Sequence, residues 1–150
     1  MSGCGIRVSS AWSDREDAVR KRLRSYRALV AQHRACEELC DSLFPSVTSR
    51  VQEVASHGSA ENPVEARTLD ILDMQARMRL SLAEMMDRIT SISDMIRNLP
   101  PDEYTILLRR YMLGENMETV SEAMSLSVRH CWTKHGKAIR TLAKDHSDLQ

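Results

Sequence analysis

Residues 116–142, NMETVSEAMSLSVRHCWTKHGKAIRTL, decide the predicted fold. Asn116 is suited to cap a first short helix, and Ser127 is suited to cap a second one. The first helix would have an apolar face, made of Met117, Val120 and Met124. The inner face of the second helix would carry Cys131, Ala138, Ile139 and Leu142. Because the pattern breaks near Ser125, the stretch predicts a helix-turn-helix, which can place the start of its second helix in a DNA major groove.

The charge of this stretch favours contact with nucleic acid. The chain has 21 basic and 21 acidic residues and is formally neutral. From Val128 to Lys144 there is nevertheless no acidic residue, and the basic ones are Arg129, Lys134, Lys137, Arg140 and Lys144. A basic second helix beside a first helix that contains Glu118 and Glu122 is suited to phosphate contact through one element.

A wider set of residues carries a family resemblance. The set is Leu99-Pro100, Arg110-Tyr111, Gly114, Val120-Ser121-Glu122, Ser127 and His135-Gly136-Lys137-Ala138-Ile139. In these residues the chain resembles ArpU-type phage transcriptional regulators, whose C-terminal part is similar to region four of bacterial primary sigma factors. The chain departs from that pattern at Ser125, Val128 and Lys134, where glycine, arginine and an apolar residue are usual. The resemblance implies sequence-specific DNA binding in phage or prophage transcription control, acting on late genes.

The resemblance also implies individual contacts. By position, it assigns base contact to Val128, Arg129, Trp132 and Thr133 and phosphate contact to Lys137. Arg129 is suited to guanine O6 and N7, and Val128 to a thymine methyl group, while Trp132 would alternatively pack against a neighbouring domain. Arg140 and Lys144, later in the same helix, would add contacts to the DNA backbone. The predicted DNA-binding set is Ser127, Val128, Arg129, Trp132, Thr133, Lys137, Arg140 and Lys144.

Two long helices are predicted before this module. The first begins at Asp14 and has an apolar stripe at Val19, Leu23, Tyr26, Val30, Cys36, Cys40 and Leu43. The second begins near Val64 and has a heptad seam at Ile71, Met78, Leu82, Met85, Ile89, Ile92, Ile96 and Leu99. The two would pair as an antiparallel hairpin. A second apolar flank of Leu72, Leu80, Met86 and Met95 would pack either on another subunit or on the same chain.

We therefore predict an all-α protein with four segments. Residues 1–13 would be a flexible N-terminus, and 14–99 a long helical hairpin with a Ser/Gly-containing loop near 45–63. Residues 100–144 would form a small three-helix, sigma-region-four-like helix-turn-helix domain that starts after Pro100-Pro101, and 145–150 a tail.

Other candidate features favour ordinary structural explanations. The basic run from Arg20 to Arg27 predicts a solvated helix face, with a nuclear-type signal or a second DNA contact as the alternatives. His33, Cys36 and Cys40 share a helix face and would suit a metal, but a fourth ligand is missing and small residues in a helix seam explain the same pattern. We therefore expect no metal or other cofactor. The sequence contains no catalytic motif, membrane span or signal peptide, so we expect a cytoplasmic protein that is not an enzyme and has no structural disulfide.

The predicted function is that of a transcriptional regulator that binds double-stranded DNA. A dimer that binds two half-sites is the expected form, because one small helix-turn-helix buries limited surface on DNA. RNA polymerase is a second candidate partner. The alternative is a helical adaptor that binds RNA polymerase or a phage packaging component without direct DNA readout.

Overall fold

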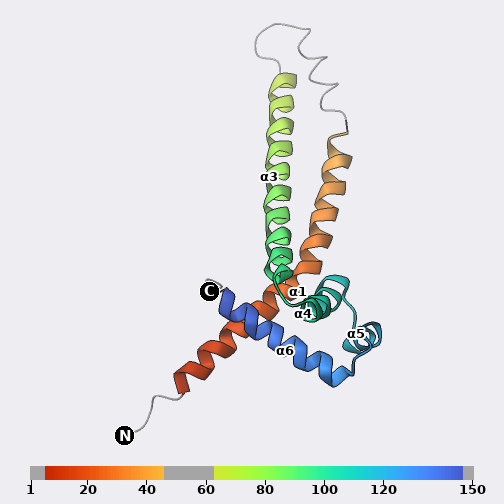
Figure 1. Cartoon of the computed structure of the whole chain (residues 1–150). Helices are drawn as coiled ribbons and strands as arrows, with labels where there is room; N and C mark the ends of the chain where they lie inside the picture. The colour runs from red at the N-terminus through yellow and green to blue at the C-terminus, as the bar shows by residue number, and fades with distance from the viewer. Residues whose placement is uncertain (1–5, 46–62, 147–150) are drawn as a thin grey trace. The chain divides into compact units, whose positions relative to one another are not determined.

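A computed structural model describes residues 6–45 and 63–146 (Figure 1). Within these residues the chain forms helices and no strand, so the predicted all-α class is confirmed. The elements are α1 (Ile6–Leu43), α3 (Pro63–Arg97), α4 (Pro101–Leu107), the π-helical segment η1 (Leu108–Leu113), α5 (Met117–Met124) and α6 (Val128–Asp145). Residues 1–5 of the predicted flexible terminus, nearly all of the predicted loop near 45–63 and residues 147–150 of the predicted tail lie outside the described residues.

The first long helix differs from the prediction at its start. The helix α1 begins at Ile6, well before Asp14, which was expected to cap it. Neither glycine nor proline occurs between Ile6 and Asp14, so nothing interrupts the helical backbone there. Continuous backbone hydrogen bonding therefore outweighs the preference of the Asp14 side chain for a cap position.

The buried stripe of α1 also differs at two positions. Val19, Leu23 and Cys40 are buried as predicted. Leu29 is 5% exposed, whereas Val30 is 40% exposed and Leu43 is 53% exposed, so the prediction was wrong at the last two. An α-helix repeats every 3.6 residues, and the stripe here advances by a step of three rather than four after Tyr26.

The structure divides into two compact units, which do not follow the predicted boundary at residues 99 and 100. One unit combines Met1–Leu29 with Ile89–Gln150, and the other is Val30–Arg88. Pro100 and Pro101 do end one helix and begin the next. The apolar stripe of α3, however, continues through Ile89–Leu99 into the core of the first unit. This shared core joins the end of the predicted hairpin to the predicted helix-turn-helix domain.

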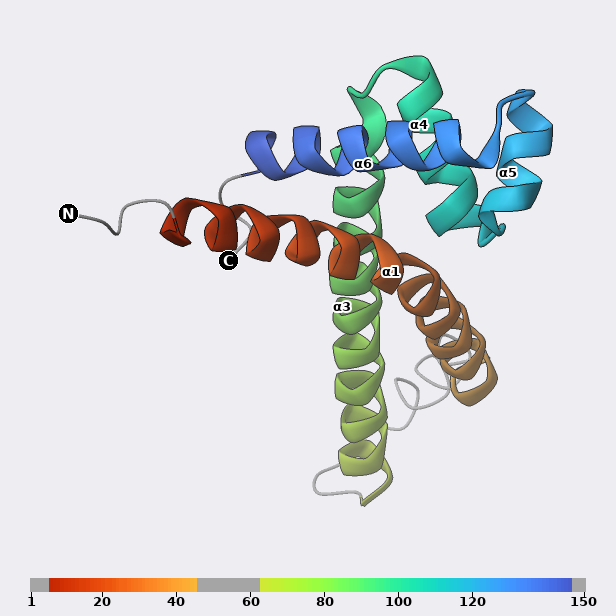
Figure 2. The ribbon, with the colours of Figure 1, turned by 90° about the horizontal axis from the view of Figure 1, so that it is seen from below.

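The core of the first unit is built by four elements. Figure 2 shows α6 beside the N-terminal part of α1, and the two contribute Val19, Leu23, Ile139 and Leu142 to one apolar cluster. The end of α3 adds the predicted seam residues, and α4 adds Leu107. The buried members of this cluster are Val19, Leu23, Leu29, Ile89, Ile92, Met95, Ile96, Leu99, Leu107, Ala138, Ile139, Leu142 and Ala143. Each large aliphatic side chain buried in this way contributes roughly 1.5–3 kcal/mol of transfer free energy.

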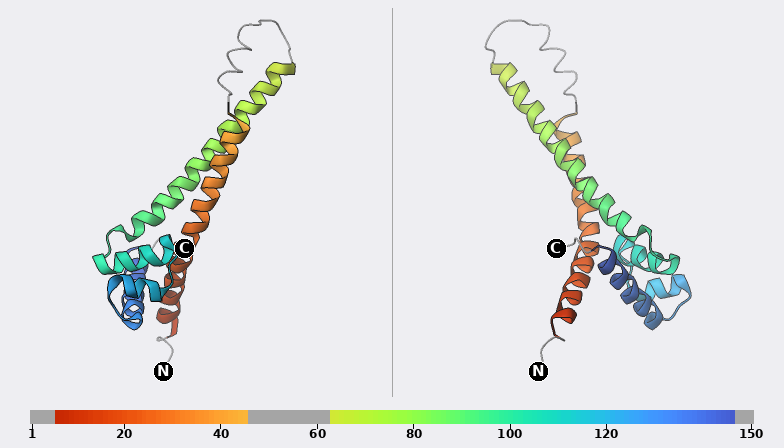
Figure 3. Two further views of the ribbon diagram at one scale, coloured as in Figure 1. Left: turned by 90° about the vertical axis from the view of Figure 1, so that its right-hand side faces the viewer. Right: turned by 60° about the vertical axis from the view of Figure 1, so that its left-hand side comes forward.

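The second apolar cluster of this unit lies among the short C-terminal helices. Figure 3 shows α4, α5 and α6 gathered beside the C-terminal end of α3. Ile106 of α4, Met117 and Val120 of α5, and Cys131 of α6 are buried together. This small core holds α5 against the start of α6, which is what the sequence pattern predicted for Met117, Val120 and Cys131.

The unit Val30–Arg88 contains the second half of α1 and the first part of α3. The predicted seam residues of α3 in this unit, among them Ile71 and Met85, are partly buried. Leu69, Met74 and Leu80 are 66%, 54% and 63% exposed. The pairing of the two long helices as an antiparallel hairpin stays a prediction.

Candidate nucleic-acid interface

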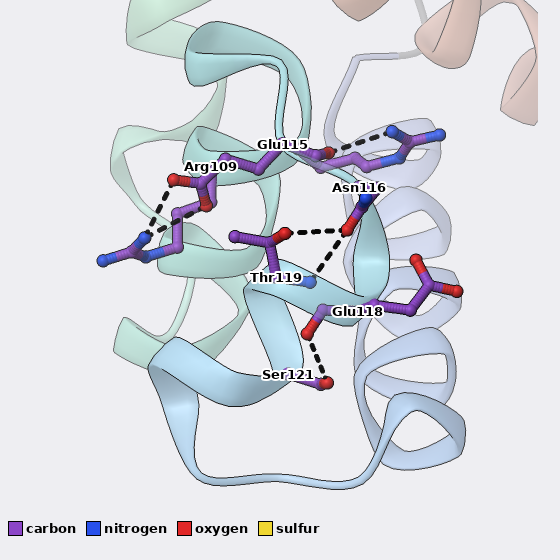
Figure 4. Close-up of polar contacts among 7 residues, drawn as sticks. Arg109, Glu115, Asn116, Glu118, Thr119 and Ser121 are labelled. Carbon is purple, nitrogen blue, oxygen red and sulfur yellow. Dashed lines mark hydrogen bonds and ion pairs between the residues drawn. The ribbon is translucent and has the colours of Figure 1, made fainter.

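The start of α5 is held by side-chain hydrogen bonds. Asn116 Oδ1 accepts a hydrogen bond from Thr119 N and another from Thr119 Oγ1, both at 2.8 Å (Figure 4). Just before it, Gly114 has a φ of 75°, and Arg109 donates to both carboxylate oxygens of Glu115 at 3.0 and 3.1 Å. The predicted N-cap at Asn116 is confirmed, and the left-handed glycine with this ion pair sets the direction in which α5 leaves η1.

The turn between α5 and α6 lies where the sequence predicted a break. Ser125 has a φ of 54°, the left-handed conformation that glycine adopts most readily. Its N–H donates to Glu122 O, and Leu126 N–H donates to Ser121 O at 3.0 Å, so both bonds close the end of α5. Ser127 then caps α6 by accepting a hydrogen bond from His130 N at 3.2 Å. The hydroxyl of Ser127 is therefore engaged in holding α6 in place.

The inner face of α6 is buried as predicted. Cys131, Ala138, Ile139 and Leu142 are each at most 2% exposed. Burial raises the pKa of the Cys131 thiol, while nearby Lys134 partly offsets the increase. His135 is also buried, at 5% exposure, although the sequence pattern had not assigned it to the core.

The outer face of α6 is exposed and basic. Arg129, Thr133, Arg140 and Lys144 are exposed, and Trp132 is 47% exposed. The hydroxyl of Thr133 donates to Arg129 O at 3.0 Å, which leaves its oxygen lone pair as an acceptor. Five members of the predicted contact set thus share one exposed surface of α6.

Val128 is the member of the predicted set that the structure places differently. Its side chain is half-buried and packs against the small cluster around Met117 and Cys131. Val128 is the first residue of α6, directly after the turn, so its apolar side chain packs at the edge of this cluster. The expectation that Val128 points outward toward a thymine methyl group is corrected accordingly.

Lys137 has a structural partner that the sequence did not indicate. Its Nζ lies 3.5 Å from Oε1 of Glu103, a carboxylate on α4 that is 4% exposed as a residue. Oε2 of Glu103 has no hydrogen-bond partner among the described residues. One turn earlier on α6, Lys134 pairs with Asp102 at 2.9 Å. Both lysines therefore join α6 to α4, and Lys137 serves the fold whether or not it contacts phosphate.

The basic run of α1 takes part in a pocket of the first unit. Arg20, Arg24 and Arg27 line it together with Trp132 of α6, and its volume is about 280 Å³. The remaining lining residues come from η1, its C-cap and α6, namely Arg110, Tyr111, Gly114 and His135. Arg24 and Arg27 are exposed, as a solvated face requires, and Arg20 is half-buried. The burial of Val19 and Leu23 orients this part of α1 so that the three arginines also line a concave surface.

Three ring side chains, Tyr111, Trp132 and His135, line part of the pocket, and the pKa values of Tyr111 and His135 are shifted. Tyr111 Oη and His135 Nε2 are joined by a hydrogen bond of 2.9 Å, and their rings stack with centroids 5.7 Å apart. The edge of Trp132 meets His135 with centroids 5.2 Å apart. Burial, reinforced by Arg20, Arg110 and Arg24, lowers the pKa of His135 to about 4, and burial raises the pKa of Tyr111. His135 is therefore a neutral imidazole at physiological pH.

The cysteines, the candidate metal site and the membrane-span criterion were also considered from the sequence. Cys36, Cys40 and Cys131 are free thiols, and Cys4 lies outside the described residues. Within residues 6–45 and 63–146, no group of three or more His, Cys, Asp or Glu side chains is arranged to hold a metal ion. None of the helices that the structure describes combines the length and apolarity needed to cross a membrane.

The residues that carry the family resemblance occupy structural positions in the first unit. Gly114 caps η1, Ser127 caps α6, and His135 and Ile139 are buried. Tyr111 and His135, whose contact the sequence did not indicate, both belong to the motifs of that resemblance. The resemblance to ArpU-type regulators stays a prediction that rests on such residues. Comparisons with models of protein families, with curated proteins and with solved structures find no match for this chain.

Proposed function

We propose that this protein is a sequence-specific DNA-binding transcriptional regulator, of the phage or prophage type that its resemblance to ArpU-type regulators implies. The observation that carries the proposal is the α5–turn–α6 unit, in which a three-residue connection, Ser125 to Ser127, joins two capped helices. In helix-turn-helix proteins the second helix of such a unit lies in the major groove and its N-terminal residues contact base edges.

The chemistry of the exposed face supports this use. Arg129 is in the first turn of α6 and exposed, as bidentate recognition of guanine requires. Thr133 lies one turn later on the same face, and Arg140 and Lys144 follow toward the C-terminal end. Under the proposal, Arg129 and Thr133 contact bases or adjacent phosphates, while Arg140 and Lys144 contact the backbone.

A protein partner is the second candidate, in keeping with an adaptor that binds RNA polymerase or a phage packaging component. The observation that favours it is the set of large apolar side chains left exposed along α3, with Leu69 at 66% and Leu80 at 63%. Such residues also suit the dimer that a regulator with two half-sites needs. The DNA-binding proposal remains the stronger one, because the acid-free outer face of α6 has a direct use only there.

The test is binding of the full-length protein to its own upstream DNA and to unrelated DNA at several salt concentrations. Arg129→Ala should weaken binding to the specific site by about 10-fold to 100-fold, since a bidentate contact to guanine is worth roughly 1–3 kcal/mol. Arg140→Ala should weaken binding to both DNAs alike and reduce the slope of log affinity against log salt concentration by about 1.

Arg79→Ala is the matched control, because Arg79 is an exposed arginine of α3 in the other unit. It should leave both affinities unchanged. Equal affinity of the wild type for the two DNAs, together with no effect of Arg129→Ala, would overturn the proposal and favour the adaptor.

A further inference from the structure

We propose that the arginine pocket of the first unit, lined by Arg20, Arg24, Arg27 and Arg110, is a binding site for a phosphate group. The proposal does not depend on how α6 meets DNA, because seven of the eight residues that line the pocket are outside the set assigned to DNA contact. Only Trp132 belongs to both sets. The phosphate can come from a DNA backbone or from a free phosphate-bearing ion, and the experiment below separates the two sources.

The charges of the pocket are only partly compensated within the protein. None of the described residues that line it carries a carboxylate. Arg20 is paired with Asp17 at 2.9 Å and with Glu16 at 3.3 Å. Among the described residues, Arg24 and Arg27 make no ion pair.

Arg110 adds a further uncompensated charge. Its Nη1 donates to the backbone carbonyl of Glu115 at 3.0 Å, and this bond orients the guanidinium without neutralising it. Like charges that converge on one concave surface repel one another, and an anion bound between them removes that repulsion. A doubly charged phosphate suits three uncompensated guanidinium groups better than a single carboxylate does.

The local backbone is shaped so that these side chains converge. The π-helical winding of η1 carries both Arg110 and Tyr111, and such segments are frequent at functional sites. Gly114 ends η1 in the left-handed conformation, and the guanidinium of Arg27 lies close against it. An arginine of α1 therefore lies beside the end of η1.

The pKa of His135 depends on the charge in the pocket. Its imidazole contacts Tyr111 and Trp132, and the arginines Arg20, Arg24 and Arg110 help to hold it neutral. A bound phosphate would offset the field of those arginines and raise the pKa of His135 from its value of about 4. The volume of about 280 Å³ accommodates one or two phosphoryl groups but not a large ligand.

The experiment titrates the full-length protein with sodium pyrophosphate and, separately, with duplex DNA. Binding is measured by calorimetry and by the NMR signals of the His135 ring across pH. The variants are Arg24→Gln and Arg27→Gln, each of which removes one of the three uncompensated pocket charges. Lys21→Gln is the matched control, because Lys21 is an exposed cation of the same helix that does not line the pocket. Circular dichroism checks that each variant is folded.

Two results support the proposal and identify the source. Saturable pyrophosphate binding that raises the His135 pKa and falls at least tenfold in Arg24→Gln and Arg27→Gln, with DNA affinity unchanged in these variants, identifies a free ion. A loss of DNA affinity in these variants that exceeds the loss in Lys21→Gln, with no saturable pyrophosphate binding, identifies a backbone phosphate. Saturable pyrophosphate binding together with such a loss of DNA affinity shows that the site accepts both.

Other results overturn it. The proposal fails if neither probe distinguishes the pocket variants from Lys21→Gln, or if pyrophosphate binding leaves the His135 signals unmoved. Retained binding of wild-type protein to its own upstream DNA in that case would leave the proposed regulator function intact, so the two failures are distinguishable.

Discussion

His135 should make the stability of the protein depend on pH between 4 and 6.5. In the unfolded chain its pKa returns to its ordinary value of 6.5, whereas in the folded protein burial, then Arg20, Arg110 and Arg24, lower the pKa to about 4. Between these values the unfolded state binds more protons than the folded state, so the free energy of unfolding rises with pH. The stabilisation is fully present above pH 6.5 and is lost as the pH falls toward 4.

The magnitude follows from the same two values. Each pH unit inside the window changes the free energy of unfolding by at most about 1.4 kcal/mol, because one pKa unit corresponds to that energy. Between pH 7 and pH 5 the loss from His135 alone should be about 2 kcal/mol, and by pH 4 it approaches about 3 kcal/mol. The near-complete burial of the side chain, 5% exposed, justifies the conversion without a large reduction for solvent screening.

The assay is urea unfolding followed by circular dichroism at pH 7, 6 and 5. His135→Gln retains a polar group for the Tyr111 hydroxyl but does not titrate, and the carboxylates of the chain contribute equally in both proteins. The wild type should therefore lose about 2 kcal/mol more than His135→Gln between pH 7 and pH 5. His130→Gln, which removes an exposed histidine of the same helix, should follow the wild type. Parallel stability curves for the wild type and His135→Gln would refute the reasoning.

Two further substitutions test the turn and the buried ion pair, each by the midpoint of urea unfolding. Ser125→Gly should stabilise the protein by about 0.5–1 kcal/mol, because relief of the left-handed conformation exceeds the extra chain entropy of glycine. Ser125→Ala is its matched control and should bring no such gain, so equal midpoints for the two variants would contradict the strain argument. Lys137→Ala should destabilise by about 1–2 kcal/mol, because the buried Glu103 carboxylate loses its cation. Adding Glu103→Gln to Lys137→Ala should restore most of that loss, and a double variant no more stable than Lys137→Ala would argue against the pair.

The Lys137 result bears on how DNA contacts should be tested. A variant that combines Arg129→Ala with Lys137→Ala would mix a loss of base contact with a loss of stability, since Lys137 supports a buried carboxylate. Arg129 and Arg140 are exposed, and neither makes an ion pair among the described residues, so their substitution tests binding alone.

Local sequence determined the features that depend on local forces. The caps at Asn116 and Ser127, the break between two helices near Ser125 and the inner face of α6 are all as predicted. Capping, turn geometry and helical periodicity involve residues within a few positions of one another, so their pattern is visible along the chain. The all-α class follows from the same local signals.

The prediction failed where continuous backbone hydrogen bonding or packing outweighs the local preference of a side chain. Asp14 lies inside α1 although it is a good cap residue, and Val128 is half-buried although the family likeness assigned it to bases. The shared core of α1, α3 and α6 also crosses the break at Pro100-Pro101, since burial of apolar surface depends on which faces meet rather than on order in the chain.

Only the tertiary structure decided what surrounds His135. The sequence shows a basic run in α1, an Arg110-Tyr111 pair and a Trp132-His135 spacing, but these segments are far apart along the chain. Their convergence on one pocket, the pairing of Lys137 with Glu103 and the low pKa of His135 arise from packing between helices. The local pattern thus specified each helix and each cap, while the burial of one shared core brought the charged side chains together, because electrostatic effects depend on distance in space and on exclusion of water.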